Sequence, residues 1–383
     1  MNAAALGTAL DAPVGTLTAG ETAGVARDVP TTMKAVELLA PRTPVLSTVA
    51  VPGVPEDGLL LKTRCVSICS TDISYFEGHL YPEAYPVILG HEYLGEVVQI
   101  GDRFDNSTDI SVGDRIVYWG QTDFGGFAEY RSVRPIFSGQ TKSDVFWADR
   151  YFHDDRMASA VKVPDDLDDL HASLIEPTTG ALRSLLTNPP APGDRVLVLG
   201  AGPIGVIAGS VIRRLFAPAQ VISVDLNKHR NAFAESQFSQ RSYVPEEFDE
   251  SVPVNTLDYV FDTLPTVHVD DDEKDPRRIA MRKLAPRGKY VLYGASQEMQ
   301  KFDTWLMLAK GINITAAPFD VHSFPMHRSA NVIASAMHML RSGIVDAAAL
   351  QTQVCKFGDY DQLIEILRTY RTTQHLKTVV DFR

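Results

Sequence analysis

The sequence has 383 residues, of which 45% are hydrophobic and 22% charged, and a net charge of −12 at pH 7. These values are typical of a globular protein of two domains. The acidic balance argues against nucleic acid and anionic membranes as partners, and no apolar run reaches the roughly 20 residues of a membrane-spanning helix. Three cysteines, Cys65, Cys69 and Cys355, cannot form a disulfide framework, so we expect a cytoplasmic protein.

Residues 1–32 differ from the rest of the chain. They are rich in Ala, Thr and Gly and contain no Lys or Arg before Arg27. A secretory signal would need a basic start and a longer apolar core. We therefore predict a disordered extension, with the folded chain beginning near Met33.

The segment from Met33 to Arg64 consists of short apolar runs interrupted by Pro and Gly. Two further strand-like runs follow, GEVVQI at 95–100 and DRIVYW at 114–119. This pattern predicts a small, mostly antiparallel β-barrel rather than a sandwich or a helical bundle.

Within this β-rich part, Cys69 and His91 are candidate metal ligands 22 residues apart, and Glu92 and Glu176 supply carboxylates. Cys, His and carboxylate together suit Zn²⁺, and three protein ligands leave a fourth position open for catalysis. Spacing alone leaves two alternatives open, because a single Cys is often a small buried hydrophobe and a Glu beside a His is often a solvated surface acid.

Residues 195–199 form an apolar strand that leads into glycines spaced as GxGxxG. This spacing is typical of a dinucleotide-binding turn at a helix N-terminus. The predicted cofactor-binding residues of the turn are Gly200, Gly202, Pro203, Ile204 and Gly205. A second strand ends in Asp225, 20 residues after Gly205, where an acid accepts hydrogen bonds from the adenosine ribose and disfavours a 2′-phosphate. We expect NAD rather than NADP, with Arg230 nearby as a feature that weakens this preference.

The chain beyond Asp225 continues the alternation of strands and helices. Strands are expected within 257–265, 289–296 and 310–318, which predicts a doubly wound parallel sheet with its ligand at the strand ends. Residues 284–288 are expected to form a helix end and a turn. The acidic run 269–278 is expected to be a solvated turn or helix start.

The motifs occur in the order seen in zinc-dependent medium-chain dehydrogenases, and the chain resembles that family over residues 33–383. The matching motifs are Cys69-Ser-Thr71-Asp72, Gly90-His91-Glu92, Gly113-Asp114-Arg115, GGFAEY at 125–130, Glu176-Pro177 and GAGPIG at 200–205. A Glu before Pro177 is similar to the polyol and sugar dehydrogenases of sorbitol or glucose type. The resemblance implies a GroES-like β-barrel catalytic domain (33–180 and 322–383) and a Rossmann domain for NAD (181–321).

The resemblance also implies the roles of individual residues. Cys69, His91 and Glu176 would hold one catalytic zinc, with Glu92 as an alternative ligand, and Thr71 would bind the substrate hydroxyl and begin a proton relay. Lys377 would face the cofactor pyrophosphate, although a surface lysine is an equal alternative. The residues expected to border the nicotinamide are Tyr293, Gly294 and Ala295.

The chain departs from this family pattern in three places. The four-cysteine lobe of a structural zinc is missing, so no structural zinc is expected. Ser74 stands where relatives often carry a His, five residues after the zinc cysteine. About twenty extra residues lie within 134–158, and this insertion is assigned either to the substrate site or to an oligomer surface.

The favoured function is a zinc- and NAD-dependent dehydrogenase acting on a secondary hydroxyl of a sugar, polyol or aminocyclitol, and a homodimer or homotetramer is implied by resemblance. One alternative is a lyase or epimerase in which tightly bound NAD is recycled without net redox change. A second alternative, a catalytically silent nucleotide-binding protein, is disfavoured by the intact zinc motif.

Overall fold

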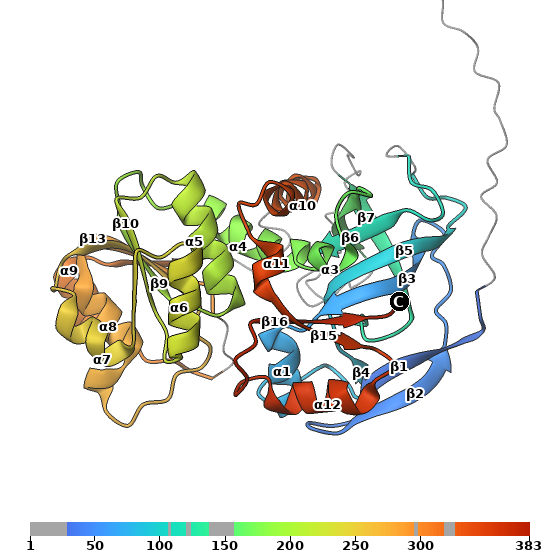
Figure 1. Ribbon diagram of the computed structural model, residues 1–383, viewed down its shortest axis with the longest axis horizontal. Helices are drawn as coiled ribbons and strands as arrows, with labels where there is room; N and C mark the ends of the chain where they lie inside the picture. The colour runs from blue at the N-terminus through green and yellow to red at the C-terminus, as the bar shows by residue number, and fades with distance from the viewer. Residues whose placement is uncertain (1–28, 106–108, 120–123, 138–156, 295–297, 318–325) are drawn as a thin grey trace, which may run out of the picture.

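The computed structural model describes residues 29–105, 109–119, 124–137, 157–294, 298–317 and 326–383. Most of the predicted extension (1–28) and the central part of the insertion (138–156) lie outside the described residues. Figure 1 shows a parallel sheet with its helices on one side of the molecule, a β-rich half on the other, and the helices α4 and α10 between them.

The β-rich half contains a closed barrel. β3 pairs with both β5 and β7, so the order β3-β5-β6-β8-β7 returns to its first strand. β15 and β16, from the end of the chain, extend the same sheet at β3. The strands of this sheet are β15 (Gln351–Lys356), β16 (Lys377–Asp381), β3 (Leu59–Ser67), β5 (Glu92–Ile100), β6 (Arg115–Trp119), β8 (Met157–Val163) and β7 (Tyr130–Phe137).

A smaller antiparallel sheet lies beside the barrel. It consists of β2 (Pro44–Ala50), β1 (Thr32–Leu38) and β4 (Val87–Ile88). The helices of the β-rich half and its border are α1 (Ser70–Glu77), α3 (Asp169–Ala172), α4 (Ile175–Thr187), α10 (Met326–Arg341), α11 (Ala347–Leu350) and α12 (Tyr360–Thr369).

The other half is a six-stranded parallel sheet in the order β11-β10-β9-β12-β13-β14. Its strands are β11 (Arg241–Tyr243), β10 (Gln220–Val224), β9 (Arg195–Leu199), β12 (Leu257–Asp262), β13 (Leu284–Leu292) and β14 (Asn313–Ala316). Its helices are α5 (Pro203–Leu215), α6 (Lys228–Gln237), α7 (Pro245–Ser251), the 3₁₀ turn η1 (Asp272–Lys274), α8 (Pro276–Lys283) and α9 (Thr304–Lys310). The chain order reverses between β9 and β12, so these two strands mark the switch point of a doubly wound sheet.

The predicted fold class, a GroES-like barrel with a Rossmann-type parallel sheet, is confirmed. The two halves share one hydrophobic cluster, since α4 packs against α10 and α5 and contributes Ala181, Leu182 and Leu185 to it. None of the described helices is long and apolar enough to span a membrane.

Two local predictions can be compared with the structure. The acidic run 269–278 was expected to be a solvated turn or helix start, and it contains the exposed turn η1 and the first residues of α8. Arg277 of α8 is nevertheless buried and donates to Asp262 Oδ2 over 2.8 Å. At 284–288, α8 ends at Lys283 as a helix end was expected, but the following residues are assigned to β13, with an irregular stretch between the pairs that Leu284 and Lys289 make with β12.

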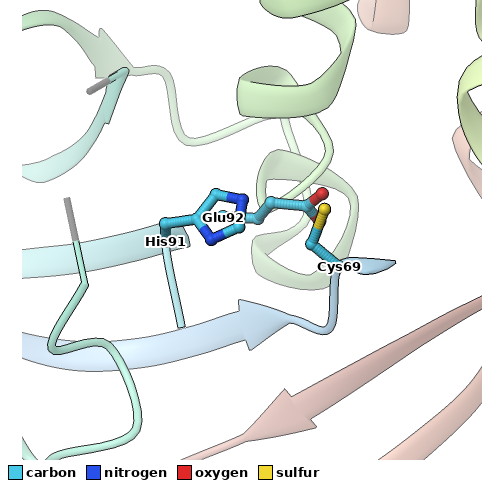
Figure 2. A group of neighbouring side chains, drawn as sticks. All are labelled: Cys69, His91 and Glu92. Carbon is cyan, nitrogen blue, oxygen red and sulfur yellow. The ribbon is translucent and has the colours of Figure 1, made fainter. Parts of the chain in front are cut away.

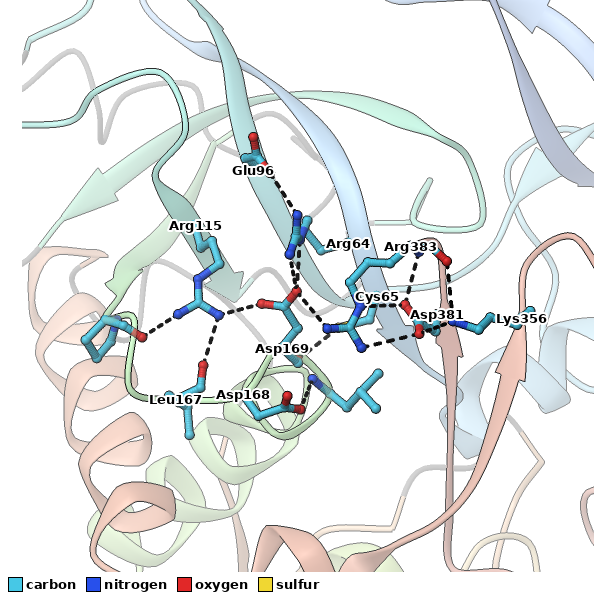
Figure 3. Close-up of polar contacts among 12 residues, drawn as sticks. Arg64, Cys65, Glu96, Arg115, Leu167, Asp168, Asp169, Lys356, Asp381 and Arg383 are labelled. Carbon is cyan, nitrogen blue, oxygen red and sulfur yellow. Dashed lines mark hydrogen bonds and ion pairs between the residues drawn. The ribbon is translucent and has the colours of Figure 1, made fainter.

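A buried carboxylate links the chain terminus to the barrel (Figure 3). Asp169, at the start of α3, accepts a hydrogen bond from Arg64 Nε over 2.9 Å and pairs with Arg115 and Arg383. Burial raises the pKa of Asp169, but Arg115 and Arg64 outweigh it and hold the pKa below its ordinary value. Three elements that are distant in the sequence therefore depend on one ionised side chain.

We predict that Asp169→Asn lowers the free energy of unfolding by about 3 kcal/mol at pH 7, because it leaves half-buried Arg115 without a charged partner among the described residues and takes one of two carboxylates from Arg64 and Arg383. The carboxylate contributes stability above its unfolded-state pKa of about 3.9, and this contribution is lost as pH falls through the lower folded-state pKa. Urea unfolding should therefore show a difference between parent and variant that shrinks below about pH 4.

The matched control is Asp168→Asn. Asp168 is exposed and caps α3 through the Leu170 N–H, and Asn caps equally well. Equal destabilisation by both substitutions would contradict the role given to Asp169.

Candidate metal and dinucleotide site

Asp72 joins the two segments that carry the predicted metal ligands. The backbone N–H of Cys69, at the start of α1, donates to Asp72 Oδ2 over 2.9 Å, and the Gly90 N–H donates to Asp72 Oδ1 over 2.9 Å. The Asp72 side chain is fully buried. One carboxylate therefore sets the distance between Cys69 and the turn that precedes β5.

Gly90 adopts a left-handed conformation with φ of 90°, which glycine tolerates without steric cost. A Cβ at this position would lie 3.0 Å from Val66 Cγ1 and 3.1 Å from the Phe127 nitrogen. The N–H groups of Gly126 and Phe127 donate to the carbonyls of Gly90 and Leu89. The GGFAEY motif therefore supports the turn that orients His91.

Three predicted ligands converge at this point. One ligand atom each of Cys69, His91 and Glu92 lies within 4.8 Å of the other two, and Figure 2 shows the side chains pointing toward one another. His91 and Glu92 are buried and Cys69 is half-buried. The Cys69 thiol donates to Thr71 Oγ1 over 3.6 Å, so the predicted relay hydroxyl lies beside the predicted ligands.

The charge of His91 is controlled by its neighbours. Burial lowers its pKa, but Asp72 and Cys69 outweigh burial, so the pKa of His91 lies well above its ordinary value. His91 Nδ1 is 3.5 Å from Asp72 Oδ1. A carboxylate in this position orients a ligating imidazole and makes it a better donor.

Glu92 is held by two side chains. Lys377 Nζ donates to Glu92 Oε1 over 2.6 Å, and Ser67 donates to Oε2. Burial lowers the pKa of Lys377, but Glu92 raises it above its ordinary value. The ammonium predicted to face the cofactor is thus paired with a metal-site carboxylate, and its contact with pyrophosphate stays a prediction.

Glu176 lies in the first turn of α4 and is buried. Its carboxyl is not among the atoms that meet within 4.8 Å. Burial raises the pKa of Glu176 to about 8, and the charges of His91, Glu92 and Lys377 also act on it. Glu176 therefore belongs to the same buried site. The positive charges of His91 and Lys377 lower its pKa less than burial raises it.

The donor set fits Zn²⁺. Soft thiolate, imidazole and carboxylate ligands are those that zinc takes in catalytic sites. The buried side chains Asp72, Glu92 and Glu176 bring three carboxyl groups to a place where Lys377 is the buried ammonium. A divalent cation would offset this negative charge and remove the reason why Glu176 resists ionisation.

The glycine-rich turn joins β9 to α5. Gly200 has φ of 97°, and a Cβ on Gly205 would lie 1.9 Å from the Gly200 carbonyl oxygen, so α5 could not pack there with any larger residue. Gly202 has open space, since Arg230 Nη1 is the one atom of the described residues that lies within 4 Å of its ideal Cβ, apart from its chain neighbours. Pro203 begins the helix and Ile204 packs against its core. A phosphate could approach this helix N-terminus closely.

Asp225 and Arg230 flank the turn with opposite charges. The Asp225 carboxylate accepts the N–H groups of Ala201 and Asn227, each over 2.8 Å. Arg230 Nε is buried and has no hydrogen-bond partner among the described residues. The acid favours ribose hydroxyls, whereas the unpaired guanidinium favours a phosphate.

A surface hollow of about 380 Å³ lies at the opposite, amino end of the parallel strands, lined by residues such as Pro189, Asp258 and Arg287. Ligands of doubly wound sheets bind beyond the carboxyl ends of the strands. We therefore assign no cofactor to this hollow.

Sequence reasoning gave Asp72 no role, although the sequence contains a signal for it. A carboxylate three residues after a helix N-cap commonly returns to the N-cap N–H, and Asp72 stands in that position after Cys69. The partners of Glu92 carried no such signal, because Ser67 and Lys377 are 310 residues apart in the chain and meet only through the pairing of β3 with β16.

Residues 55–137 match the model of the alcohol dehydrogenase GroES-like domain. An L-threonine 3-dehydrogenase of Shewanella woodyi is 31% identical over 217 residues, which are 55% of this chain and 62% of that protein. The chain thus spans about 62% of the length of that relative.

Two solved structures share the fold over nearly the whole chain. A dehydrogenase of Sinorhizobium meliloti bound to NADP superposes with a TM-score of 0.71 at 21% identity, covering 92% of this chain and 100% of its own. Galactitol-1-phosphate dehydrogenase of Escherichia coli superposes with a TM-score of 0.71 at 18% identity, covering 91% and 100%. These similarities show that the chain shares the fold of the two dehydrogenases, and the family match places an alcohol dehydrogenase GroES-like domain at residues 55–137.

Proposed function

We propose that the protein is a zinc-dependent alcohol dehydrogenase that transfers a hydride between NAD and a secondary hydroxyl of a sugar, polyol or aminocyclitol. The observation that carries this proposal is the convergence of Cys69, His91 and Glu92 within 4.8 Å in a chain that also presents a dinucleotide-binding turn. A metal site alone would fit many hydrolases, but the pairing of the two fits alcohol oxidation.

Cys69, His91 and Glu176 would hold the zinc, with Glu92 as an alternative ligand. When bound, zinc supplies a Lewis acid that lowers the pKa of a nearby alcohol. NAD, held at the 200–205 turn, supplies the hydride acceptor. The expectation of one zinc and no second, structural zinc remains a prediction.

The chain's own residues position the substrate and move its proton. In the reaction a hydride leaves the carbinol carbon for the nicotinamide and a proton leaves the hydroxyl, so the carbon is oxidised to a ketone. Thr71 lies beside Cys69 and would accept that proton first. With Ser74 in place of a His, the proton would leave by another route. Lys377 pairs with Glu92 and so holds this carboxylate beside Cys69 and His91.

The secondary-hydroxyl class is supported by the relatives. Threonine and galactitol-1-phosphate, the substrates in their names, both carry secondary hydroxyl groups. The finer assignment to polyols rests on Glu176, which stands where sorbitol- and glucose-type enzymes carry Glu.

An assembly of two or four chains is part of the proposal. The edge strand β14 has no neighbour on its outer side among the described residues, and Trp305 and Leu308 in the adjacent helix α9 are 73% and 79% exposed. Pairing of two β14 edges would bury this apolar surface. A cytoplasmic location stays a prediction from the cysteine content, and Cys65, Cys69 and Cys355 are all free thiols.

The direct test is nicotinamide absorbance with a panel of sugars, polyols and aminocyclitols, using protein of known zinc content and both NAD and NADP. Turnover of one class supports the proposal and names the substrate. Failure with every secondary alcohol would overturn it. NAD that remains bound through purification, without NADH release, would point instead to a lyase or epimerase. The feature that favours this alternative is the insertion within 134–158, most of which lies outside the described residues.

We predict that Cys69→Ser reduces turnover at least about 1,000-fold, because a hydroxyl is a far poorer zinc ligand than a thiolate. Bound zinc, measured by atomic absorption, should fall in parallel, and NAD affinity should change little. The matched control is Cys355→Ser, at a buried cysteine of β15. Retention of both zinc and activity by Cys69→Ser would remove this residue from the site.

We also predict that Asp225→Ala raises KM for NAD about 10- to 100-fold, the cost of losing hydrogen bonds to a charged group. KM for NADP should change less or fall, because the repulsion of its 2′-phosphate is removed. Glu246→Ala, at an exposed acid of α7, controls for the loss of one negative charge. A parent protein that prefers NADP would contradict the argument from Asp225.

A further inference from the structure

Tyr293 follows directly after β13, at the edge of the parallel sheet where the dinucleotide-binding turn lies. Its N–H and that of Gly294 donate to the Asp262 carbonyl over 2.8 and 3.0 Å. At the same edge, the Thr263 N–H donates to the Leu199 carbonyl, immediately before the turn. The backbone of Tyr293 is therefore fixed at the carboxyl ends of the strands that flank the switch point.

The Tyr293 side chain reaches across to the helix that carries Glu176. A Cβ at Gly180 of α4 would lie 2.6 Å from the Tyr293 hydroxyl oxygen and 3.9 Å from Trp119 Nε1. Gly180 is four residues after Glu176, and residues at this spacing lie on the same helix face, about 5–6 Å apart. The hydroxyl therefore occupies the space that the missing side chain leaves, one turn from a proposed zinc ligand.

The Tyr293 hydroxyl does not contribute a hydrogen bond to the fold of the described residues. The Tyr293 ring packs on Phe261 with centroids 5.7 Å apart, but its hydroxyl has no hydrogen-bond partner among the described residues. Two other tyrosines of the same sheet differ, because Tyr259 donates to the Asn188 carbonyl over 2.7 Å and Tyr290 to Asp262 over 3.0 Å. A tyrosine has an apolar ring and a polar hydroxyl, so the Tyr293 hydroxyl is free to bind a ligand while its ring packs in the core.

The surroundings keep the Tyr293 phenol protonated. Burial raises its pKa well above the ordinary value, and the neighbouring acidic groups of Glu176, Cys69 and Glu92 raise it further. The group is then a hydrogen-bond donor at neutral pH rather than a base. The hydroxyl lies against Gly180 of α4, one turn from Glu176, whereas Thr71 of α1 lies beside Cys69.

We propose that Tyr293 is a specificity-determining residue, whose hydroxyl donates a hydrogen bond to a substrate oxygen on the carbon next to the one that is oxidised. The inference rests on the proposed function, since Thr71 already serves the reacting oxygen. A second donor, on a different element, would select substrates with neighbouring hydroxyls. Gly180 would belong to the same substrate-recognition site, because any side chain at this position would displace the Tyr293 phenol.

The test compares a polyol that the parent oxidises with its analogue lacking the hydroxyl next to the reacting carbon. Tyr293→Phe keeps the ring and removes the donor. The ratio of kcat/KM for the polyol to that for the deoxy analogue should fall about tenfold, the upper range for one neutral hydrogen bond. Most of the change should be in KM. An unchanged ratio would overturn the inference.

Gly180→Ala provides an independent variant. Alanine is favoured in a helix interior by about 1 kcal/mol, so the fold should persist while the hydroxyl is pushed away, and the ratio should again fall. Tyr259→Phe is the control, because it removes a structural hydrogen bond of the same sheet and should lower Tm without changing the ratio. An equal change in the ratio with Tyr259→Phe would show that Tyr293 acts only through stability.

Failure of this inference differs from failure of the proposed function. A parent that oxidises the polyol while Tyr293→Phe keeps the parent ratio contradicts only the role of Tyr293. A zinc-loaded parent that oxidises no secondary alcohol contradicts both. Zinc content and NAD affinity, measured on each variant, should match the parent, and loss of either would assign Tyr293 to the metal or cofactor instead of the substrate.

Discussion

The site depends on one buried carboxylate. Asp72 binds the backbone of Cys69 and of Gly90 and lies 3.5 Å from the His91 ring, so it fixes both ligand segments at once. A buried acid with unpaired acceptors is costly, and one with three well-placed neighbours is stable. The distance between the ligand on the loop before α1 and the ligands at the start of β5 therefore depends on this carboxylate.

The second constraint is electrostatic. Asp72, Glu92 and Glu176 bring carboxyl groups into the interior, and Lys377 offsets the charge of Glu92. Burial raises the pKa of Glu176 to about 8, and a cation beside it would favour its ionised form. A metal ion would therefore act on stability as well as on chemistry, since binding to the folded state alone stabilises it. In this respect the site differs from the Asp169 cluster, where Arg64, Arg115 and Arg383 all pair with the one carboxylate of Asp169.

The site lies where the two halves of the molecule meet. α1 and β5 supply Cys69, His91 and Glu92 from the barrel, the 200–205 turn comes from the parallel sheet, and α4 lies between the halves with Glu176 and Gly180 on one face. α4 packs on both α5 and α10, so its position relative to each half is set by the shared core. Hydride transfer needs the two reacting carbons in contact, and α4 is the element that couples the sheet to the barrel.

The sequence by itself determined the local features: β9 with its glycine turn, the strand that ends at Asp225, and the order of the Cys69, His91 and Glu176 motifs. Each of these features depends on residues that are close together in the sequence, such as a glycine that adopts a positive φ in a tight turn. Only the tertiary structure decided which distant groups pair: Lys377 with Glu92, Arg277 with Asp262, Asp169 with three arginines, and Tyr293 with Gly180. Such contacts depend on strand pairing and helix packing across hundreds of residues, and no spacing along one chain encodes them.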